Sequence, residues 1–392
     1  IQRLVSNPHD EEALAKAHHA GQADPKGYAA LLERVGHGTT DPSYAAHWLS
    51  ESASVWSMTV GDAHQAARML MAAIDKDPTA EVPAERLGAL YRENGDVKAL
   101  VALLERQVKA LAPLLPQRPE LAPRLSAIHE ELGRSWGEPP LSRADRALEH
   151  WRRLVELDPR HALGIYQTRE LHKAQEQWAE AVPYFALEQA LADDPERKLA
   201  LYRDESAVRM RAGDGPGASN ALREARTLAP DDIALAQEFA SSVLARVDSG
   251  EPVGAEDREE GRAIFASLME SYDGEYGYSY AVSALRLGPG DDRAMQLAAH
   301  YGAQLGRDAE LLPLFGAYLA QNPAGYMAEE AHRRGATPQA AALPRAPLPL
   351  ATPSASSLPE LEPESFEPAS PKAAPQEAPA AQAQPGAHGA SG

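Results

Sequence analysis

The chain has 392 residues, a formal net charge of −19 and no cysteine. The absence of cysteine excludes disulfides and thiolate metal sites. The acidic balance argues against nucleic acid as a partner, because Lys and Arg supply most of that affinity. It favours a basic protein partner, or serves solubility alone.

Hydrophobic residues make up 44% of the chain but aromatic residues only 6%, which is typical of closely packed, Ala-rich helices rather than of β-sheets. No apolar run approaches the roughly 18 residues that a membrane-spanning helix needs. We therefore expect no membrane span. The expected location is the cytoplasm, with the periplasm left open.

Two helical stretches are predicted near the N-terminus, over Asp10–Ala20 and Pro25–Val35. Gly21 interrupts after the first stretch, and Gly36-His37-Gly38 ends the second. We interpret residues 1–42 as a degenerate N-terminal repeat.

A regular spacing follows from residue 43. Gly61 precedes Pro78 by 17 residues, and Gly95 follows Gly61 by 34. The spacing of 17 recurs from Gly213 to Pro230 and from Gly306 to Pro323. A glycine fits a tight turn between helices, and a proline ends a helix because it lacks an N–H group. A period near 34 predicts an array of helix pairs, in which each pair buries its apolar face against its neighbours.

The segments Leu87-Gly88-x-x-Tyr91 and Leu132-Gly133-x-x-Trp136 place a small residue among larger ones in the first helix of a pair. With the period of 34, they resemble the tetratricopeptide repeat family, whose unit is a helix–turn–helix. The resemblance covers most of residues 43–324. It implies an all-α, right-handed α-solenoid of about seven to eight repeats. Arg169 departs from the pattern, because it takes the place of the small residue, and Pro183 lies inside a predicted helix.

The pattern is most regular over residues 43–231. We expect residues 232–336 to form an irregular continuation with a C-terminal repeat cap, since the stretch 232–289 is too long for one period. Eleven prolines then fall between residues 341 and 392. Residues 337–392 are predicted to be a disordered, Pro/Ala-rich acidic tail, because they have too little apolar surface to offset their ordering entropy. This tail is either a linker or, through Pro344-x-x-Pro347 and Pro368-x-x-Pro371, a docking ligand.

The resemblance also implies that the first helices of successive units line a concave groove. The groove positions are Trp48, Glu51, Val55, Met58, Glu85, Ala89, Arg92, Tyr166, Glu170, Lys173, Arg203, Ala207 and Met210. Each is either a ligand contact or a packing or solvated residue. No asparagine falls at these positions, so we do not expect the clamp for a terminal carboxylate that many chaperone-binding members of the family use.

Four tyrosines lie within nine residues, at Tyr272, Tyr276, Tyr278 and Tyr280. Tyrosine combines a large contact area with a polar tip, which suits recognition. The intervening glycines favour a loop or a helix end. The run is either an exposed aromatic patch or packing between repeats.

The sequence holds no phosphate-binding loop, no Gly-x-Gly-x-x-Gly, no Gly-x-Ser-x-Gly and no His-Glu-x-x-His. We expect no catalytic site, no metal and no cofactor. The first hypothesis is a non-enzymatic scaffold that binds a protein or peptide segment in the groove. The alternative is the regulatory or targeting region of a larger enzyme, such as a kinase or transferase, with its catalytic domain before Ile1, since the sequence does not begin with Met.

Overall fold

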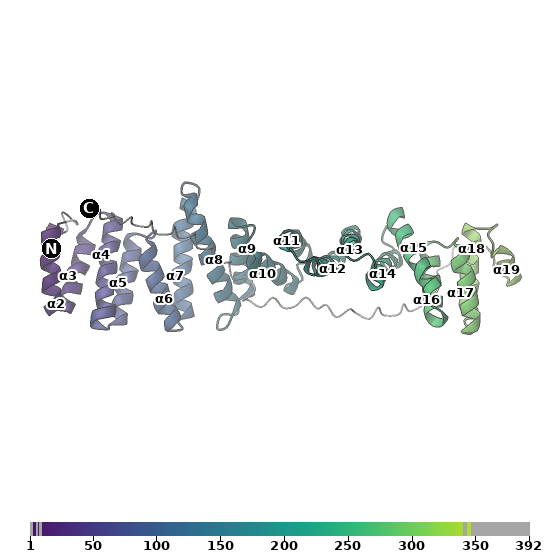
Figure 1. Cartoon of the computed structure of the whole chain (residues 1–392), viewed down its shortest axis with the longest axis horizontal. Coiled ribbons are helices and arrows are strands. Elements are labelled where there is room, and N and C mark those ends of the chain that lie inside the picture. The colour runs from purple at the N-terminus through teal and green to yellow at the C-terminus, as the bar shows by residue number, and fades with distance from the viewer. Residues whose placement is uncertain (1–2, 5–6, 8–9, 340–342, 346–392) are drawn as a thin grey trace, which may run out of the picture.

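The computed structural model describes residues 3–4, 7, 10–339 and 343–345. Within them lie eighteen α-helices, α2 to α19, with one short π-helical and two 3-10 segments. The helices stack in chain order into an elongated array that has α2 and α19 at opposite ends (Figure 1). The predicted all-α solenoid is confirmed. Most of the predicted tail, namely 340–342 and 346–392, lies outside the described residues.

The array consists of eight units and a terminal helix. The first six units are the pairs α2 (Glu11–Ala23) and α3 (Pro25–Gly38), α4 (Pro42–Ser54) and α5 (Ala63–Lys76), α6 (Glu81–Glu93) and α7 (Val97–Leu111), α8 (Ala122–Gly137) and α9 (Ala144–Leu157), α10 (Ala162–Ala174) and α11 (Trp178–Leu191), and α12 (Pro195–Arg211) and α13 (Gly215–Leu228). A three-helix unit follows, made of α14 (Ile233–Asp248), α15 (Ala255–Ser271) and α16 (Gly274–Leu287). The pair α17 (Asp292–Gln304) and α18 (Asp308–Gln321) precedes the last helix, α19 (Ala328–Arg333).

Three shorter segments complete the described elements. The π-helical segment η1 (Val55–Val60) extends α4, and the 3-10 segments η2 (Ala112–Leu114) and η3 (Pro119–Leu121) occupy the long connection between α7 and α8. No helix in the described part of the chain is both long and apolar enough to cross a membrane.

One turn recurs after the first helix of a unit. Five first helices, α6, α10, α12, α14 and α17, are each followed by a residue with positive φ, namely Gly95, Glu176, Gly213, Gly250 and Gly306. The next amide then bonds back to a carbonyl in the last helical turn, as when Asp214 N–H donates to Arg209 O at 2.8 Å. This Schellman-type ending satisfies carbonyls that the helix leaves free. Glycine adopts the conformation without strain, whereas Glu176 holds φ 57° with a full side chain.

A second turn recurs between units. Five second or last helices of a unit end at a residue with φ between −133° and −151°, and each of these residues directly precedes a proline: Asp77, Asp158, Ala229, Gly288 and Asn322. In the first unit the same ending lies inside the unit, at Asp24 before Pro25. The residue before proline avoids the helical region, so the proline fixes this exit. Because α14 ends like a first helix and α16 like a second, α15 is the helix added in the long stretch 232–289.

Aspartate begins many of the helices. Nine N-cap aspartates accept a backbone N–H bond from the first helical turn: Asp10, Asp24, Asp41, Asp62, Asp96, Asp194, Asp214, Asp232 and Asp291. A negative charge at this position also stabilises the helix dipole. Part of the acidic excess is therefore structural.

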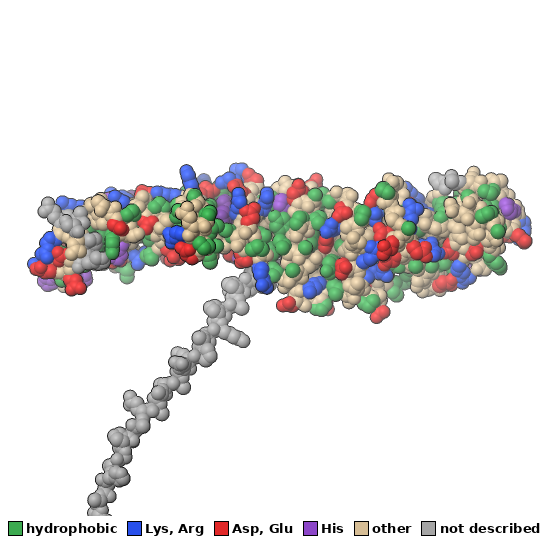
Figure 2. Space-filling view, turned by 90° about the horizontal axis from the view of Figure 1, so that it is seen from above, with side chains coloured by type: hydrophobic (Ala, Val, Ile, Leu, Met, Phe, Trp, Pro, Cys, Tyr) green, Lys and Arg blue, Asp and Glu red, His purple; other side chains and the backbone are tan. Residues whose placement is uncertain are grey.

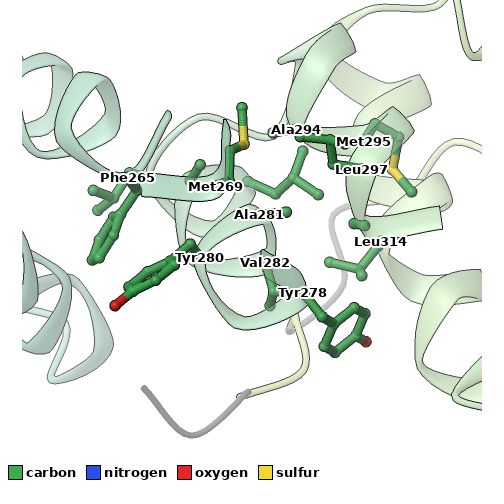
Figure 3. Close-up of a cluster of buried hydrophobic side chains, with 14 of the residues drawn as sticks. Phe265, Met269, Tyr278, Tyr280, Ala281, Val282, Ala294, Met295, Leu297 and Leu314 are labelled. Carbon is green, nitrogen blue, oxygen red and sulfur yellow. The ribbon is translucent and has the colours of Figure 1, made fainter. Parts of the chain in front are cut away.

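The apolar cores lie between helices of the same and adjacent units. The largest runs from α13 to α19 and includes Phe239 and Phe315. Figure 3 shows part of this core, with Phe265 and Tyr278 labelled. Small residues permit the close contacts that these cores need. A Cβ added to Gly133 on α8 would lie 2.5 Å from the indole of Trp151 on α9, which explains the glycine in the Leu-Gly-x-x-aromatic signature.

The positive-φ residue of the turn within a unit can be tested by replacing a glycine and by introducing one. Gly213 has φ 77° and open space where a Cβ would lie, so Gly213→Ala isolates the backbone cost. We expect a loss of about 1 kcal/mol in the free energy of unfolding, whereas Glu176→Gly should raise it by roughly 0.5 kcal/mol. Chemical denaturation followed by circular dichroism measures both. An unchanged stability for Gly213→Ala would mean that the left-handed turn is not required.

Candidate functional site

The predicted groove residues differ in exposure. Met58, Glu85, Ala89, Arg92 and Ala207 are exposed, and Glu51, Val55, Tyr166, Glu170, Lys173, Arg203 and Met210 are half-buried. Trp48 is only 7% exposed and packs in the core beside Leu32 and Val35 of α3. Contrary to its predicted place in the groove, Trp48 is a core residue and presents little surface to a ligand.

The tyrosine run lies in and just before α16, with Gly277 inside that helix rather than in a loop. Tyr278 and Tyr280 are buried and donate hydrogen bonds to Glu310 at 2.9 Å and Gln237 at 3.1 Å. Burial raises the pKa of Tyr280 to about 12. Only Tyr272 and Tyr276 are exposed, in an edge-to-face pair. Packing between units, one of the two alternatives, therefore accounts for Tyr278, whose partner lies on α18, whereas Tyr280 packs within its own three-helix unit.

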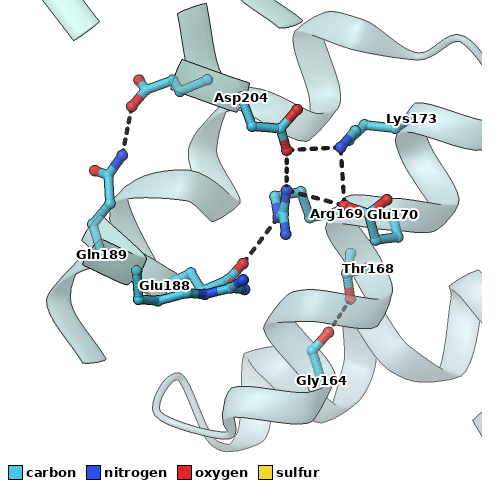
Figure 4. A network of polar contacts seen from close by, with 10 residues as sticks. Gly164, Thr168, Arg169, Glu170, Lys173, Glu188, Gln189 and Asp204 are labelled. Atoms are coloured by element: carbon cyan, nitrogen blue, oxygen red, sulfur yellow. Dashed lines mark hydrogen bonds and ion pairs between the residues drawn. The ribbon is translucent and has the colours of Figure 1, made fainter. Parts of the chain in front are cut away.

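The contacts of Arg169 explain why this large residue replaces the small residue of the repeat pattern (Figure 4). Its guanidinium is fully buried and donates to Glu188 on α11 at 2.9 Å and to Asp204 on α12 at 2.6 Å. It also lies 4.6 Å from the centre of the Phe185 ring. Lys173 completes the network, 2.7 Å from Asp204 and 3.0 Å from Glu170. A buried cation thus joins α10, α11 and α12 where the pattern has a small residue.

Removing this cation should be costly. Arg169→Met removes the buried cation that joins the buried Glu188 and the half-buried Asp204, and leaves them only Arg197 and Lys173 as partners, so we expect a loss of roughly 3 kcal/mol in the free energy of unfolding. The double variant Arg169→Met/Glu188→Gln should recover part of that loss, because it removes a buried carboxylate that has lost one of its two cations. Denaturation of the two variants and of Glu188→Gln alone gives the comparison. A single variant as stable as the parent chain would show that the network does not hold these helices together.

Arginine side chains join neighbouring units across both faces. On first helices, Arg92 binds Glu131 with two bonds of 2.5 and 2.8 Å, and Arg203 lies 2.8 Å from Glu238. On second helices, Arg146 reaches Glu105 at 2.9 Å. Acidic and basic side chains are accordingly interspersed along the face seen in Figure 2. Cations at predicted groove positions, including Lys173, are therefore already paired within the protein.

Two adjoining hollows open between the first helices α6 and α8, with volumes of about 190 and 450 Å³. We call them together the α6–α8 cleft. They share Arg92, Ala127 and Glu131, while Leu103 and Leu104 of α7 contribute to the lining of the smaller hollow. Gly88 adds no side chain to the wall, and a Cβ there would meet only the Arg92 guanidinium, at 3.5 Å. Of the predicted groove residues, Glu85 and Arg92 line this cleft.

Some of the charged side chains that line the cleft form ion pairs and others do not. Arg92 is held by Glu131, and Arg134 by Glu130 at 2.5 Å. Arg124 donates to the carbonyl of Thr79 at 2.6 Å and to Gln107 Oε1 at 2.7 Å. Three further lining carboxylates, Glu81, Glu85 and Glu138, have no ion-pair partner within the described residues. Arg124 has no carboxylate at ion-pair distance, but Glu81 and Glu85 act on its guanidinium electrostatically. With five carboxylates and three guanidiniums in its lining, the cleft keeps an anionic excess.

Gln107 on α7 lines the same cleft and is only 3% exposed. Arginine can only donate, so the bond from Arg124 identifies the amide oxygen of Gln107 and leaves its nitrogen as the free end. This Nε2 is buried and lacks a hydrogen-bond partner. A buried donor without an acceptor is costly, and an acceptor that reached it would offset that cost.

Behind the cleft, α8 packs on α9 through two buried histidines. His129 and His150 face each other with 3.1 Å between their Nδ1 atoms, so one ring donates and the other accepts. Burial lowers the pKa of His129 to about 4, with a smaller contribution from His150, and burial also lowers the pKa of His150. The unfolded chain thus binds more protons than the folded chain below pH 6.5.

This pair should make stability depend on pH. The two histidines impose no penalty well above pH 6.5, and the free energy of unfolding should fall as the pH drops from 6.5 towards 4, by roughly 3 kcal/mol. We expect His129→Gln to reduce this loss, and His37→Gln, at an exposed position, to leave it unchanged. Denaturant midpoints at several pH values measure the difference. An equal pH dependence in all three chains would contradict the assignment.

Sequence comparison identifies no relative: no family model and no curated protein matches the chain. Solved structures similar to it include the MamA protein, at 16% identity over 56% of this chain and 93% of that one, with a TM-score of 0.29. YrrB, described as a TPR protein with an unusual peptide-binding site, is 16% identical over 57% and 98%, with a TM-score of 0.26. The C-terminal part of a TPR repeat-containing protein from Cytophaga hutchinsonii is 13% identical over 73% and 97%, with a TM-score of 0.30.

At such low identities and TM-scores, the class of the protein follows from its own geometry. The helix pairs, the two alternating turns and the cores between units define a tetratricopeptide-like α-solenoid. Folds of this class typically serve as protein-binding scaffolds. In the part of the chain that the structure describes, no group of three or more His, Asp or Glu is placed to hold a metal ion.

Proposed function

We propose that this chain is a non-enzymatic scaffold that holds an extended segment of a partner protein against its first helices, with the α6–α8 cleft as the principal contact. The observation that supports the proposal most strongly is the composition of the cleft. Leu103, Leu104 and Ile128 line a hollow to which Gln107, whose buried Nε2 has no acceptor, also contributes. Apolar pockets with a few placed polar groups are the usual form of a binding site.

The mode of binding is passive. The cleft walls belong to α6 and α8, which are held by the packing of their units, and Arg92–Glu131 joins them directly. A preformed site loses little conformational entropy when a ligand binds, so most of the ordering cost falls on the partner segment. Backbone groups of an extended segment offer the carbonyl acceptors that Gln107 lacks.

Site-specific photocrosslinking in the native extract tests this function. A benzoylphenylalanine at Ala127, which is exposed and shared by both hollows, should crosslink a defined partner. The same probe at Glu180, exposed on the second helix α11, is the control and should not crosslink that partner. Adding Gly88→Leu to the Ala127 probe fills the cleft and should abolish the crosslink.

The steric block suits this test because the nearest atoms to a Cβ at position 88 belong to a side chain that can move and not to the backbone. The Arg92 side chain is the nearest group to a Cβ at position 88, and replacing a helical glycine raises helix propensity by up to about 1 kcal/mol. Crosslinks that form equally from Ala127 and Glu180, or that persist with Gly88→Leu, would contradict the cleft as the binding site.

A further inference from the structure

We propose that the α6–α8 cleft selects a segment that carries Lys or Arg side chains. This inference rests on the proposed scaffold function and adds the chemistry of the partner. It depends on which charges of the cleft are still available once the internal ion pairs have formed.

The cations of the cleft are committed to the protein itself. Arg92 and Arg134 pair with Glu131 and Glu130, and Arg124 is directed to carbonyl oxygens of the connection between α5 and α6. Glu130 has a further partner in His161, at 3.3 Å. An acidic ligand at Arg92 or Arg134 would have to displace one of these pairs and leave a carboxylate of the protein uncompensated. At Arg124 it would meet the negative charges of Glu81 and Glu85. The internal pairing therefore disfavours an acidic segment.

The free carboxylates lie towards both ends of the cleft. Glu81 and Glu85 are four residues apart on α6, so they lie on one face of the helix, and like charges at this spacing repel each other. Glu138 caps the C-terminal end of α8 beside the larger hollow. A cationic side chain near Glu81 and Glu85 would relieve their repulsion and gain Coulomb energy.

The apolar lining suits the stem of the same side chain. Lys and Arg bury their methylene groups on apolar surface while the charged end stays near water or a carboxylate. Ala84, Gly88 and Ile128 provide such surface in the lining of the smaller hollow, together with Glu81 and Glu85. Gln107 lies in the same lining, and a small turn of its side chain would offer its unpaired Nε2 donor to a backbone carbonyl, which favours a peptide over a free cation.

Fluorescence anisotropy on the full chain tests the inference with three labelled nonapeptides, of alternating Ala and Lys, Ala and Glu, and Ala and Ser. The Ala/Lys peptide should bind most tightly. Glu81→Gln/Glu85→Gln should weaken its binding by about tenfold and flatten its dependence on salt concentration. The matched control is Glu180→Gln/Glu224→Gln, which removes two exposed carboxylates from second helices. Because salt screens charges that are distant from the cleft, this variant should leave the affinity for the Ala/Lys peptide within about twofold.

Gly88→Leu is the second variant, and it should abolish Ala/Lys binding without changing the net charge. Equal weakening by both double variants would show general attraction to an acidic surface and would overturn the proposal. Tight binding of the Ala/Glu or Ala/Ser peptide, lost with Gly88→Leu, would overturn the cationic preference but leave the scaffold function intact. Failure of all three peptides to bind would also overturn the preference, whereas the scaffold function is decided independently by crosslinking from Ala127.

Discussion

Each unit of this chain leaves an apolar helix face that only the next unit can cover, and the rest of the structure follows from this constraint. Two alternating turns keep successive units in contact: a left-handed residue within a unit and a pre-proline residue between units. The result is a long array in which the first helices form a shared surface. The side chains that remain exposed on this surface are the ones available to bind a partner.

Electrostatic pairing determines which of those side chains remain available. Arginines bind carboxylates about one unit away along the chain, as Arg92 does with Glu131, and Arg169 places the same chemistry in the core. Aspartates at helix N-termini account for part of the remaining acidity. A net charge of −19 therefore does not by itself describe the binding surface. The informative groups are the few unpaired ones, and in the α6–α8 cleft these are Glu81, Glu85 and Glu138.

The helix pairs could be predicted from the sequence because their signals are local: a glycine or a proline sets many of the turns, and Gly133 makes room for a neighbouring aromatic ring. The sequence does not predict α15 as an added helix, because no proline follows Gly250 at the usual spacing of 17 residues. Trp48 was misplaced because the π-helical turn Val55–Val60 inserts extra residues before Gly61, which rotates the preceding positions. The cleft could not be predicted, because it depends on ion pairs between residues far apart in the sequence. The like-charged residues Glu81 and Glu85, four positions apart on one helix, are its only local signal.

The most direct test of this account is hydrogen exchange of the full chain, with and without the saturating Ala/Lys peptide. The account predicts slower exchange of amides in α6, α7 and α8, because a ligand in the cleft contacts all three helices and suppresses their local opening. It predicts little change in α10 to α14, where the cations and carboxylates already pair with one another. Slower exchange that is centred on α10 to α14, or spread evenly over the array, would contradict the cleft as the binding site.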